Sequence, residues 1–149
     1  MQTAYGPEAF ATYESHAFGH ISAQDGNVGD TSLHLQFSNG VLAWLHCAET
    51  YGMFADFTIA GDKGTLRFAT NPWLPQAEDN VIELIREDES VEQITVTSQD
   101  DAFFYEVRLV RDCIERGILE AMRPAPRRSD SYEIMDFLTR WEAAVWQSL

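Results

Sequence analysis

The four histidines are the side chains of this sequence best suited to chemistry, because imidazole binds metal ions and exchanges protons near neutral pH. They are His16, His20, His34 and His46. His16 and His20 are four residues apart, a spacing that suits a metal pair on a helix. The residues around them favour a strand, where this spacing places two side chains on one face about 13 Å apart, too far for one ion. The sequence therefore predicts no metal site.

The sequence lacks the short motifs that mark common cofactor and catalytic sites. It contains no GxGxxG segment, no glycine-rich phosphate loop followed by Lys and Ser or Thr, no CxxC, no HExxH and no GxSxG. A dinucleotide-binding fold also needs strands that alternate with crossover helices. We therefore expect no cofactor bound by this chain alone and assign no catalytic residue. A hydrolase built from scattered polar residues has no motif to support it.

Composition predicts one globular domain, residues 1–149, which is long enough to bury a sizeable core. The formal net charge is −14, from 24 acidic and 10 basic residues. Such a chain repels phosphate backbones and anionic membrane surfaces, so we expect no nucleic-acid and no membrane partner. The start, MQTAYGPEAFA, lacks the features of a secretion signal, which favours a cytoplasmic protein. In that compartment Cys47 and Cys113 are expected to be buried, reduced thiols.

The stretch from Leu33 to Cys47 predicts a β-hairpin around Asn39-Gly40, with a two-residue type I′ turn. That register places one set of side chains on one face: Leu33, Leu35, Phe37, Leu42, Trp44 and His46. The other face then carries His34, Gln36, Ala43, Leu45 and Cys47. Because apolar side chains occur on both faces, we expect both to be covered, one by helices and the other by something else.

Further strands are expected on either side of this hairpin. The predicted segments are residues 8–23 with a break near Gly19, Met53–Ala60, Thr65–Ala69, and a second hairpin over Val81–Thr97 with its tip at Glu87–Ser90. Loops are expected at Gln24–Asp30, at Gly61–Gly64 and over Thr70–Asp79, where prolines prevent regular pairing.

The hydrophobic period changes to a helical one at Ser98, which with Asp101 resembles a capping arrangement. The first helix is expected to end at Gly117, and Ser129 is expected to cap a second. The predicted apolar stripes are Phe103, Val107, Val110 and Ile114, and then Ile134, Leu138, Trp141, Val145 and Leu149. Strands followed by helices predict an α+β fold: an open, mainly antiparallel sheet with helices packed on one face and the other face available for dimerisation.

Several short segments occur in a characteristic order. They are LHLQFSNG at 33–40 with AWL at 43–45, IAGDKGTL at 59–66, NPW at 71–73, FYE at 104–106, IERG at 114–117, and Pro124 before SDS at 129–131. Together they span residues from about 7 to 146 and resemble the C-terminal domain of the Gfo/Idh/MocA oxidoreductases, such as glucose–fructose oxidoreductase and inositol dehydrogenase.

The resemblance implies the substrate-side and oligomerisation domain of an NAD(P)-dependent dehydrogenase acting on a sugar, a polyol or a related hydroxy or carbonyl compound. In this family NAD(P) and a Lys-Pro motif belong to an N-terminal Rossmann domain, and a motif with Asp, Gly and His comes just before the region that resembles this chain. None of these appears here. NAD(P) is therefore implied only for a full-length enzyme, and the chain is expected to be inactive alone. The alternative is a stand-alone dimeric binding or assembly module without catalytic activity.

The resemblance also suggests which residues border a substrate, because the second domain of the family supplies one wall of the substrate pocket. The candidates are Asn71, Trp73 and Tyr105. An indole face stacks on a sugar ring or a nicotinamide. Other interpretations stay open: Trp73 covers a sheet edge or an interface, and Tyr105 packs at the start of a helix.

In the family the sheet face without helices commonly packs against another subunit, so we expect a homodimer or higher oligomer through this face. The dimer-face candidates are His34, Gln36, Trp44 and His46. His46 either titrates within such an interface or serves as a hydrogen-bonded partner with no catalytic task.

Overall fold

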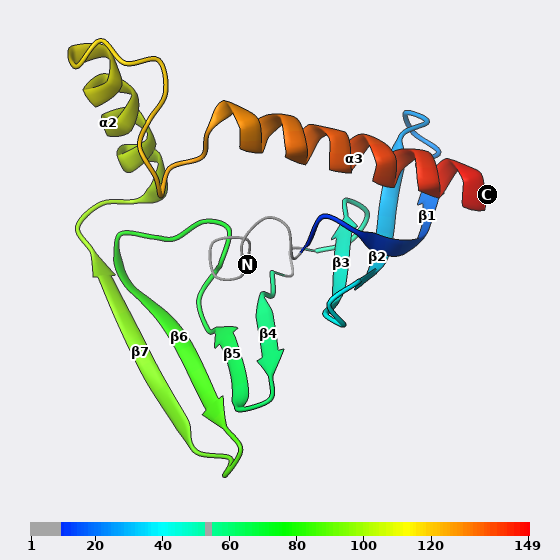
Figure 1. Ribbon diagram of the computed structural model, residues 1–149, viewed down its shortest axis with the longest axis horizontal. Helices are drawn as coiled ribbons and strands as arrows, with labels where there is room; N and C mark the ends of the chain where they lie inside the picture. Colours follow the sequence, from blue (N-terminus) through cyan, green and yellow to red (C-terminus); the bar gives the residue numbers. More distant parts are fainter. Residues whose placement is uncertain (1–9, 53–54) are drawn as a thin grey trace. The chain divides into compact units, whose positions relative to one another are not determined.

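The computed structural model describes residues 10–52 and 55–149 (Figure 1). The chain divides into two compact units, Met1–Gly52 with Arg128–Leu149, and Met53–Arg127. All strand pairs in the described residues are antiparallel, and the strands form two open sheets of three and four strands. The expected α+β class with an open antiparallel sheet is confirmed, although the strands form two sheets instead of one. The predicted strand residues 8–9 and 53–54 lie outside the described part.

The first unit contains a three-stranded sheet and one long helix. Its strands are β1 (Tyr13–Ile21), β2 (Val28–Phe37) and β3 (Leu42–Ala48), in the order β1-β2-β3. Helix α3 (Arg128–Ser148) packs across β1 and β2 (Figure 1). The expected break near Gly19 is displaced, because β1 runs through this residue and its register shifts between His20 and Ile21.

The hairpin between β2 and β3 has a three-residue turn, so the predicted two-residue type I′ turn is wrong. The N–H of Phe37 donates to the carbonyl of Val41 over 2.9 Å, and Gly40 has a φ of +87° whereas Asn39 does not have a positive φ. The Asn39 side chain instead accepts from the Val41 N–H over 3.1 Å, which closes the longer turn. This one-residue change reverses the two faces of β3 relative to the prediction.

The observed register pairs Leu33 with Leu45 and His34 with Trp44. The alternate residues of β2 and β3 that point toward α3 therefore include both leucines, and Trp44 points away from the helix with 73% of its surface exposed. The predicted register, which placed Trp44 on the same face as Leu35, is therefore wrong. The core consists of buried Ala17, Leu33, Leu35 and Val145, with partly buried Tyr13, Val28, Phe37, Ala43, Leu45, Phe137, Trp141 and Ala144 around them.

Helix α3 uses only part of its predicted apolar stripe. Val145 is fully buried, and Trp141 is packed against the core. Ile134, Leu138 and Leu149 are exposed, because the sheet covers the turns that carry Phe137, Trp141 and Ala144. The helix begins at Arg128, so Ser129 lies in its first turn and does not cap it as predicted.

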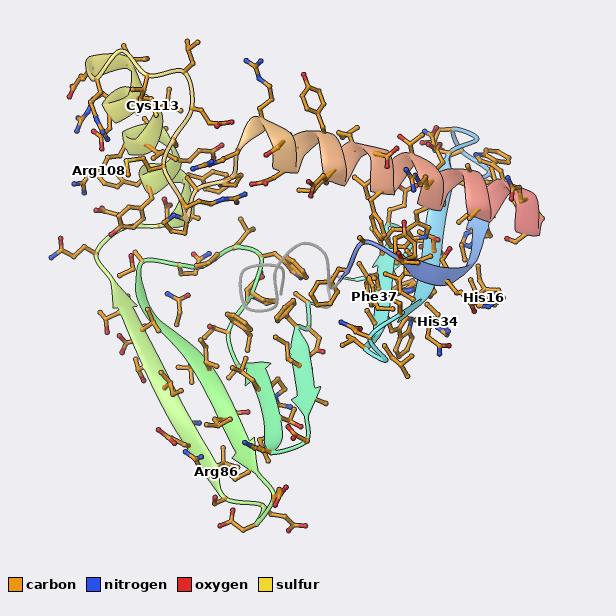
Figure 2. All side chains as sticks on the ribbon, viewed as in Figure 1. His16, His34, Phe37, Arg86, Arg108 and Cys113 are labelled. Atoms are coloured by element: carbon orange, nitrogen blue, oxygen red, sulfur yellow. The ribbon has the colours of Figure 1, made fainter. Side chains whose placement is uncertain are left out.

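The second unit contains a four-stranded sheet and helix α2 (Ala102–Glu115). The strands follow one another in the order β4 (Thr58–Gly61), β5 (Gly64–Phe68), β6 (Glu78–Arg86) and β7 (Val91–Ser98). The hairpin tip predicted at Glu87–Ser90 is confirmed, and the Arg86 N–H donates to the Ser90 carbonyl over 2.9 Å. Figure 2 labels Arg86 at the end of this hairpin.

Asp101 caps helix α2, with its carboxylate accepting from the Phe104 N–H over 2.8 Å. Ser98, which the sequence placed at this cap, is instead the last residue of β7. Gly117 follows the helix with a φ of +63°, which confirms the predicted end. The predicted stripe of α2 is exposed, and no described residue of the second unit is buried. The buried core of the described chain therefore lies in the first unit.

Both cysteines are free, and Cys47 is exposed where a buried thiol was expected. None of the described helices combines the length and the apolar content needed to cross a membrane.

Candidate functional site

The face of the three-stranded sheet opposite α3 is here called the open face. Because side chains alternate along a strand, every second residue of β1, β2 and β3 projects from it. Its members are Glu14, His16, Phe18, His20, Asp30, Ser32, His34, Gln36, Leu42, Trp44, His46 and Ala48. All four histidines of the sequence therefore lie on one face.

The observed register also gathers the four residues that the sequence proposed for a dimer face. The predicted register had placed His34 and Gln36 on the face opposite Trp44 and His46. In the structure His34 pairs with Trp44, Gln36 pairs with Leu42, and Ser32 pairs with His46, so all four candidates share the open face. Figure 2 shows His16 and His34 on the side of the sheet away from α3.

The middle of the open face is aromatic and exposed. The ring of His34 meets Phe18 and Trp44 edge-on, with centroid separations of 6.0 and 5.7 Å. Leu42 beside them is 72% exposed and Trp44 is 73% exposed. A hollow of about 480 Å³ lies here, lined by Glu14, His16, His34, Gln36, Leu42 and Trp44 together with Leu35 and Ala43. Such an apolar, sparsely charged centre is typical of a surface that binds another molecule.

His46 is hydrogen-bonded at both ring nitrogens, which matches its interpretation as a hydrogen-bonded partner. Its Nδ1 lies 2.8 Å from the hydroxyl of Ser32. Its Nε2 is hydrogen-bonded to the hydroxyl of Tyr51, and the two rings stack with centroids 6.0 Å apart. This network fixes the orientation of the imidazole at the edge of the open face.

Asp30 anchors the segment that follows β3. Its carboxylate accepts hydrogen bonds from the Thr50 hydroxyl over 2.5 Å and from the Glu49 N–H over 3.2 Å, and it lies 3.3 Å from His20 Nε2. The Thr50 hydroxyl is the main cause that lowers the pKa of Asp30 below its usual value, with His20 adding a smaller effect. Asp30 is therefore ionised at neutral pH and offsets a positive charge on His20.

The open face does not hold a metal cluster. No group of three or more His, Cys, Asp or Glu side chains within residues 10–52 and 55–149 is arranged to hold a metal ion. His16 and His34 are direct neighbours on β1 and β2, but a third ligand from these residues does not join them.

Asn71 and Trp73 lie in the loop between β5 and β6 of the second unit. The Asn71 side-chain oxygen accepts from the Trp73 N–H over 2.9 Å and from the Leu74 N–H over 3.2 Å, which shapes the loop. The indole of Trp73 meets the ring of Phe57 edge-on at 5.9 Å and remains 64% exposed. This loop therefore presents one flat aromatic surface on a stiff support.

Tyr105 lies in the first turn of α2, where its hydroxyl accepts a hydrogen bond from the Ser98 hydroxyl over 3.3 Å. Its ring meets Phe104 edge-on at 5.8 Å. No hydrogen bond or ring contact within the described residues links Tyr105 to Asn71 or Trp73. The three proposed pocket residues thus form one pair in a loop and one separate residue on a helix.

Sequence reasoning missed several members of the open face, above all His16, Phe18 and Leu42. For β1 the signal was present, because Glu14, His16, Phe18 and His20 recur with the period of a strand. For Leu42 no such signal was available, since its face depends on the length of the turn at Asn39-Gly40.

A scan against protein-family models gives no match for this chain, and a search of the curated proteins gives none.

Proposed function

We propose that this chain is the substrate-side and oligomerisation domain of an NAD(P)-dependent oxidoreductase of the Gfo/Idh/MocA type. The substrate is a sugar, a polyol or a related hydroxy or carbonyl compound. An N-terminal Rossmann domain supplies NAD(P) and the catalytic groups, so the chain is inactive alone. The ordered sequence segments support this proposal, as does an α+β fold whose C-terminal helix covers one face of an open antiparallel sheet.

The observation that carries the proposal is the composition of the open face. Its centre exposes Phe18, Leu42 and Trp44, whereas its strands contribute two carboxylates, Glu14 and Asp30, in a chain of net charge −14. A stable interface has an apolar centre that is depleted in charge. A symmetric dimer buries the same surface on both copies, so these side chains are removed from water on each of the two subunits.

The loop that carries Trp73 is the proposed wall of the substrate site. Asn71 uses its side-chain oxygen to hold the turn, and its amide N–H₂ makes no hydrogen bond within the described residues. The exposed indole face of Trp73 stacks on the apolar face of a sugar or polyol, and the amide donates to one of its hydroxyl groups. In this proposal the loop binds and orients the substrate and takes no part in hydride transfer, which NAD(P) supplies when bound to the Rossmann domain.

The decisive experiment asks whether a dinucleotide-binding domain accompanies this chain and whether the assembled protein oxidises a sugar or polyol. The reading frame upstream of the Met1 codon and the neighbouring genes are sequenced, and the longest polypeptide containing residues 1–149 is expressed with any partner that carries a GxGxxG segment. This protein is assayed for reduction of NAD⁺ and NADP⁺ with a panel of aldoses and polyols. We expect turnover with at least one of them, and no binding of NAD(P)H by the 149-residue chain alone.

Two matched substitutions separate the proposed roles of the two exposed tryptophans. Trp73→Ala should raise KM about tenfold, as expected when a stacking contact worth about 1.4 kcal/mol is lost, and should leave the oligomeric state unchanged. Trp44→Ala should weaken self-association and leave KM unchanged at concentrations where the variant is still assembled. An unchanged KM in Trp73→Ala would remove the loop from the substrate site.

The absence of any dinucleotide-binding segment, in the same frame or in a neighbouring gene, would end the oxidoreductase proposal. If the chain still self-associates through the open face in that case, the stand-alone assembly module replaces it. Light scattering measures this self-association directly, and the Trp44→Ala variant shows whether the open face is responsible.

A further inference from the structure

We propose that self-association through the open face is linked to protonation: a second copy of this chain binds at neutral pH and is released as His16 and His34 gain protons. This inference rests on the self-association included in the proposed function and adds its regulation. The relevant observation is that the two imidazoles are direct cross-strand partners in the centre of an aromatic, sparsely charged surface.

His16 and His34 differ from the other two histidines in what surrounds their rings. His20 lies 3.3 Å from the carboxylate of Asp30, so a proton on His20 is offset within the chain. His46 has oxygen atoms of Ser32 and Tyr51 at its two ring nitrogens. Neither His16 nor His34 makes a hydrogen bond or an ion pair with any described residue, and His34 is in contact with two aromatic rings.

Protonation of both residues places two positive charges directly opposite each other on neighbouring strands, which is unfavourable even in water. Glu14, which also lines the hollow, can offset one of these charges. The other acidic group on the face, Asp30, is already bonded to Thr50 and His20, and the Tyr51 hydroxyl is bonded to His46. The charged groups of α3 lie on the opposite face of the sheet, because the helix packs against Ala17, Leu33 and their neighbours.

A symmetric contact makes this effect larger. Two copies that meet through the open face bring two further imidazoles to the same apolar centre, where the loss of water strengthens every like-charge repulsion. Glu14 offsets one of the two imidazolium charges on each copy, and the other charge remains without compensation. Association at neutral pH therefore excludes protons from these imidazoles, and the dissociation constant must rise as the pH falls and they become protonated.

The charge of the whole chain favours a second copy as the partner. It also lets the proposal be distinguished from a general charge effect, because the two predict opposite trends with pH. At net charge −14, two copies repel each other least through a face with few carboxylates. Acidification toward the isoelectric point near 4.4 reduces the general repulsion between copies and by itself favours association. The proposal predicts the opposite trend. An acidic protein partner would also bind more tightly, and not less, once the histidines are charged.

Sedimentation velocity of the 149-residue chain at constant ionic strength measures the dimer dissociation constant from about pH 7.5 to about pH 5.5. We expect it to rise at least tenfold over this interval. In the double variant His16→Gln, His34→Gln it should stay within about twofold of its value at neutral pH. The control His20→Gln should keep the tenfold rise, since Asp30 already offsets that residue. Circular dichroism at each pH establishes that every variant is folded.

Each other outcome has a distinct meaning. A dimer whose dissociation constant does not change with pH, or tightens on acidification, overturns the proton linkage while self-association stands. A rise that persists in the double variant also overturns the role of His16 and His34. A chain that is monomeric at about 100 µM and neutral pH, or a dimer that Trp44→Ala does not weaken, contradicts the open-face interface and the proposed function with it.

Discussion

The indole N–H of Trp141 donates to the hydroxyl of Thr31 over 2.8 Å, which joins two residues 110 positions apart in the sequence. The Thr31 hydroxyl in turn donates to the carbonyl of Phe18 over 3.0 Å. One continuous chain of hydrogen bonds therefore runs from α3 through β2 to β1. Because an indole N–H that is partly withdrawn from water needs an acceptor, this hydrogen bond contributes to fixing the turn of α3 that lies on the sheet.

Replacing Trp141 by Phe tests this connection. The variant keeps an aromatic ring in the core but removes the N–H, so the free energy of unfolding should fall by about 1–2 kcal/mol. Urea denaturation followed by circular dichroism measures the change. Trp146→Phe on the same helix is the matched control, because Trp146 is 49% exposed and makes no hydrogen bond within the described residues. Equal effects of the two substitutions would show that the hydrogen bond contributes nothing.

Gly19 is required where α3 crosses β1. A Cβ atom added at this position would lie 2.7 Å from the carbonyl oxygen of Asp30 and 2.9 Å from a methyl group of Val145. Gly19→Ala should therefore lower the free energy of unfolding by about 1–3 kcal/mol, because a strand and the helix must shift to admit the methyl group. Gly52→Ala, where an added Cβ has no neighbour within 4 Å, should change it by less than about 0.5 kcal/mol. A neutral Gly19→Ala variant would contradict this packing of α3.

The turn at Asn39-Gly40 decides which side chains of β3 enter the core, and a pair of truncations tests it. Leu33 is 2% exposed, and Leu33→Ala should destabilise the protein by about 2–5 kcal/mol. Trp44→Ala should change stability by less than about 0.5 kcal/mol when measured on the monomer, since the indole is 73% exposed. Urea midpoints at low protein concentration measure both. A destabilisation by Trp44→Ala as large as that by Leu33→Ala would support the two-residue turn, which places both side chains on one face.

Much of the fold could be predicted from local patterns. The α+β class, the hairpin tip at Glu87–Ser90 and the end of α2 at Gly117 follow from period and turn chemistry within a few residues of each position. The division of the strands into two sheets could not, because it depends on pairing between distant segments. The exposure of the apolar stripe of α2 could not be predicted either. An amphipathic pattern shows which face of a helix is apolar, but it does not show which element packs against that face.

The candidate site shows the same limit at single residues. Period-two spacing is enough to place His16 and His20 on one face of β1. Whether His46 joins them depends on one residue in a turn, where the Asn39 side chain accepts from the Val41 N–H and lengthens the loop. A slip of one residue reverses a whole strand, so the sequence did not place His34 and Gln36 on the same face as Trp44 and His46.

Asp30 makes stability depend on acid pH in a defined direction. Its pKa is lowered from the ordinary value of 3.8, chiefly because the Thr50 hydroxyl donates a hydrogen bond that stabilises the ionised carboxylate in the folded chain. The stabilisation is therefore fully present above pH 3.8 and is lost as pH falls below that value, when the folded state must take up the proton. Asp30→Asn should remove this part of the acid dependence and free the segment that carries Thr50. Urea midpoints measured between about pH 6 and pH 3 give the slope for the unchanged chain and the variant.

Asp62→Asn, at an exposed turn where the carboxylate has no partner among the described residues, is the control and should leave the slope unchanged. If Asp30→Asn has the same acid slope as the unchanged chain, Asp30 does not contribute to the linkage between folding and pH.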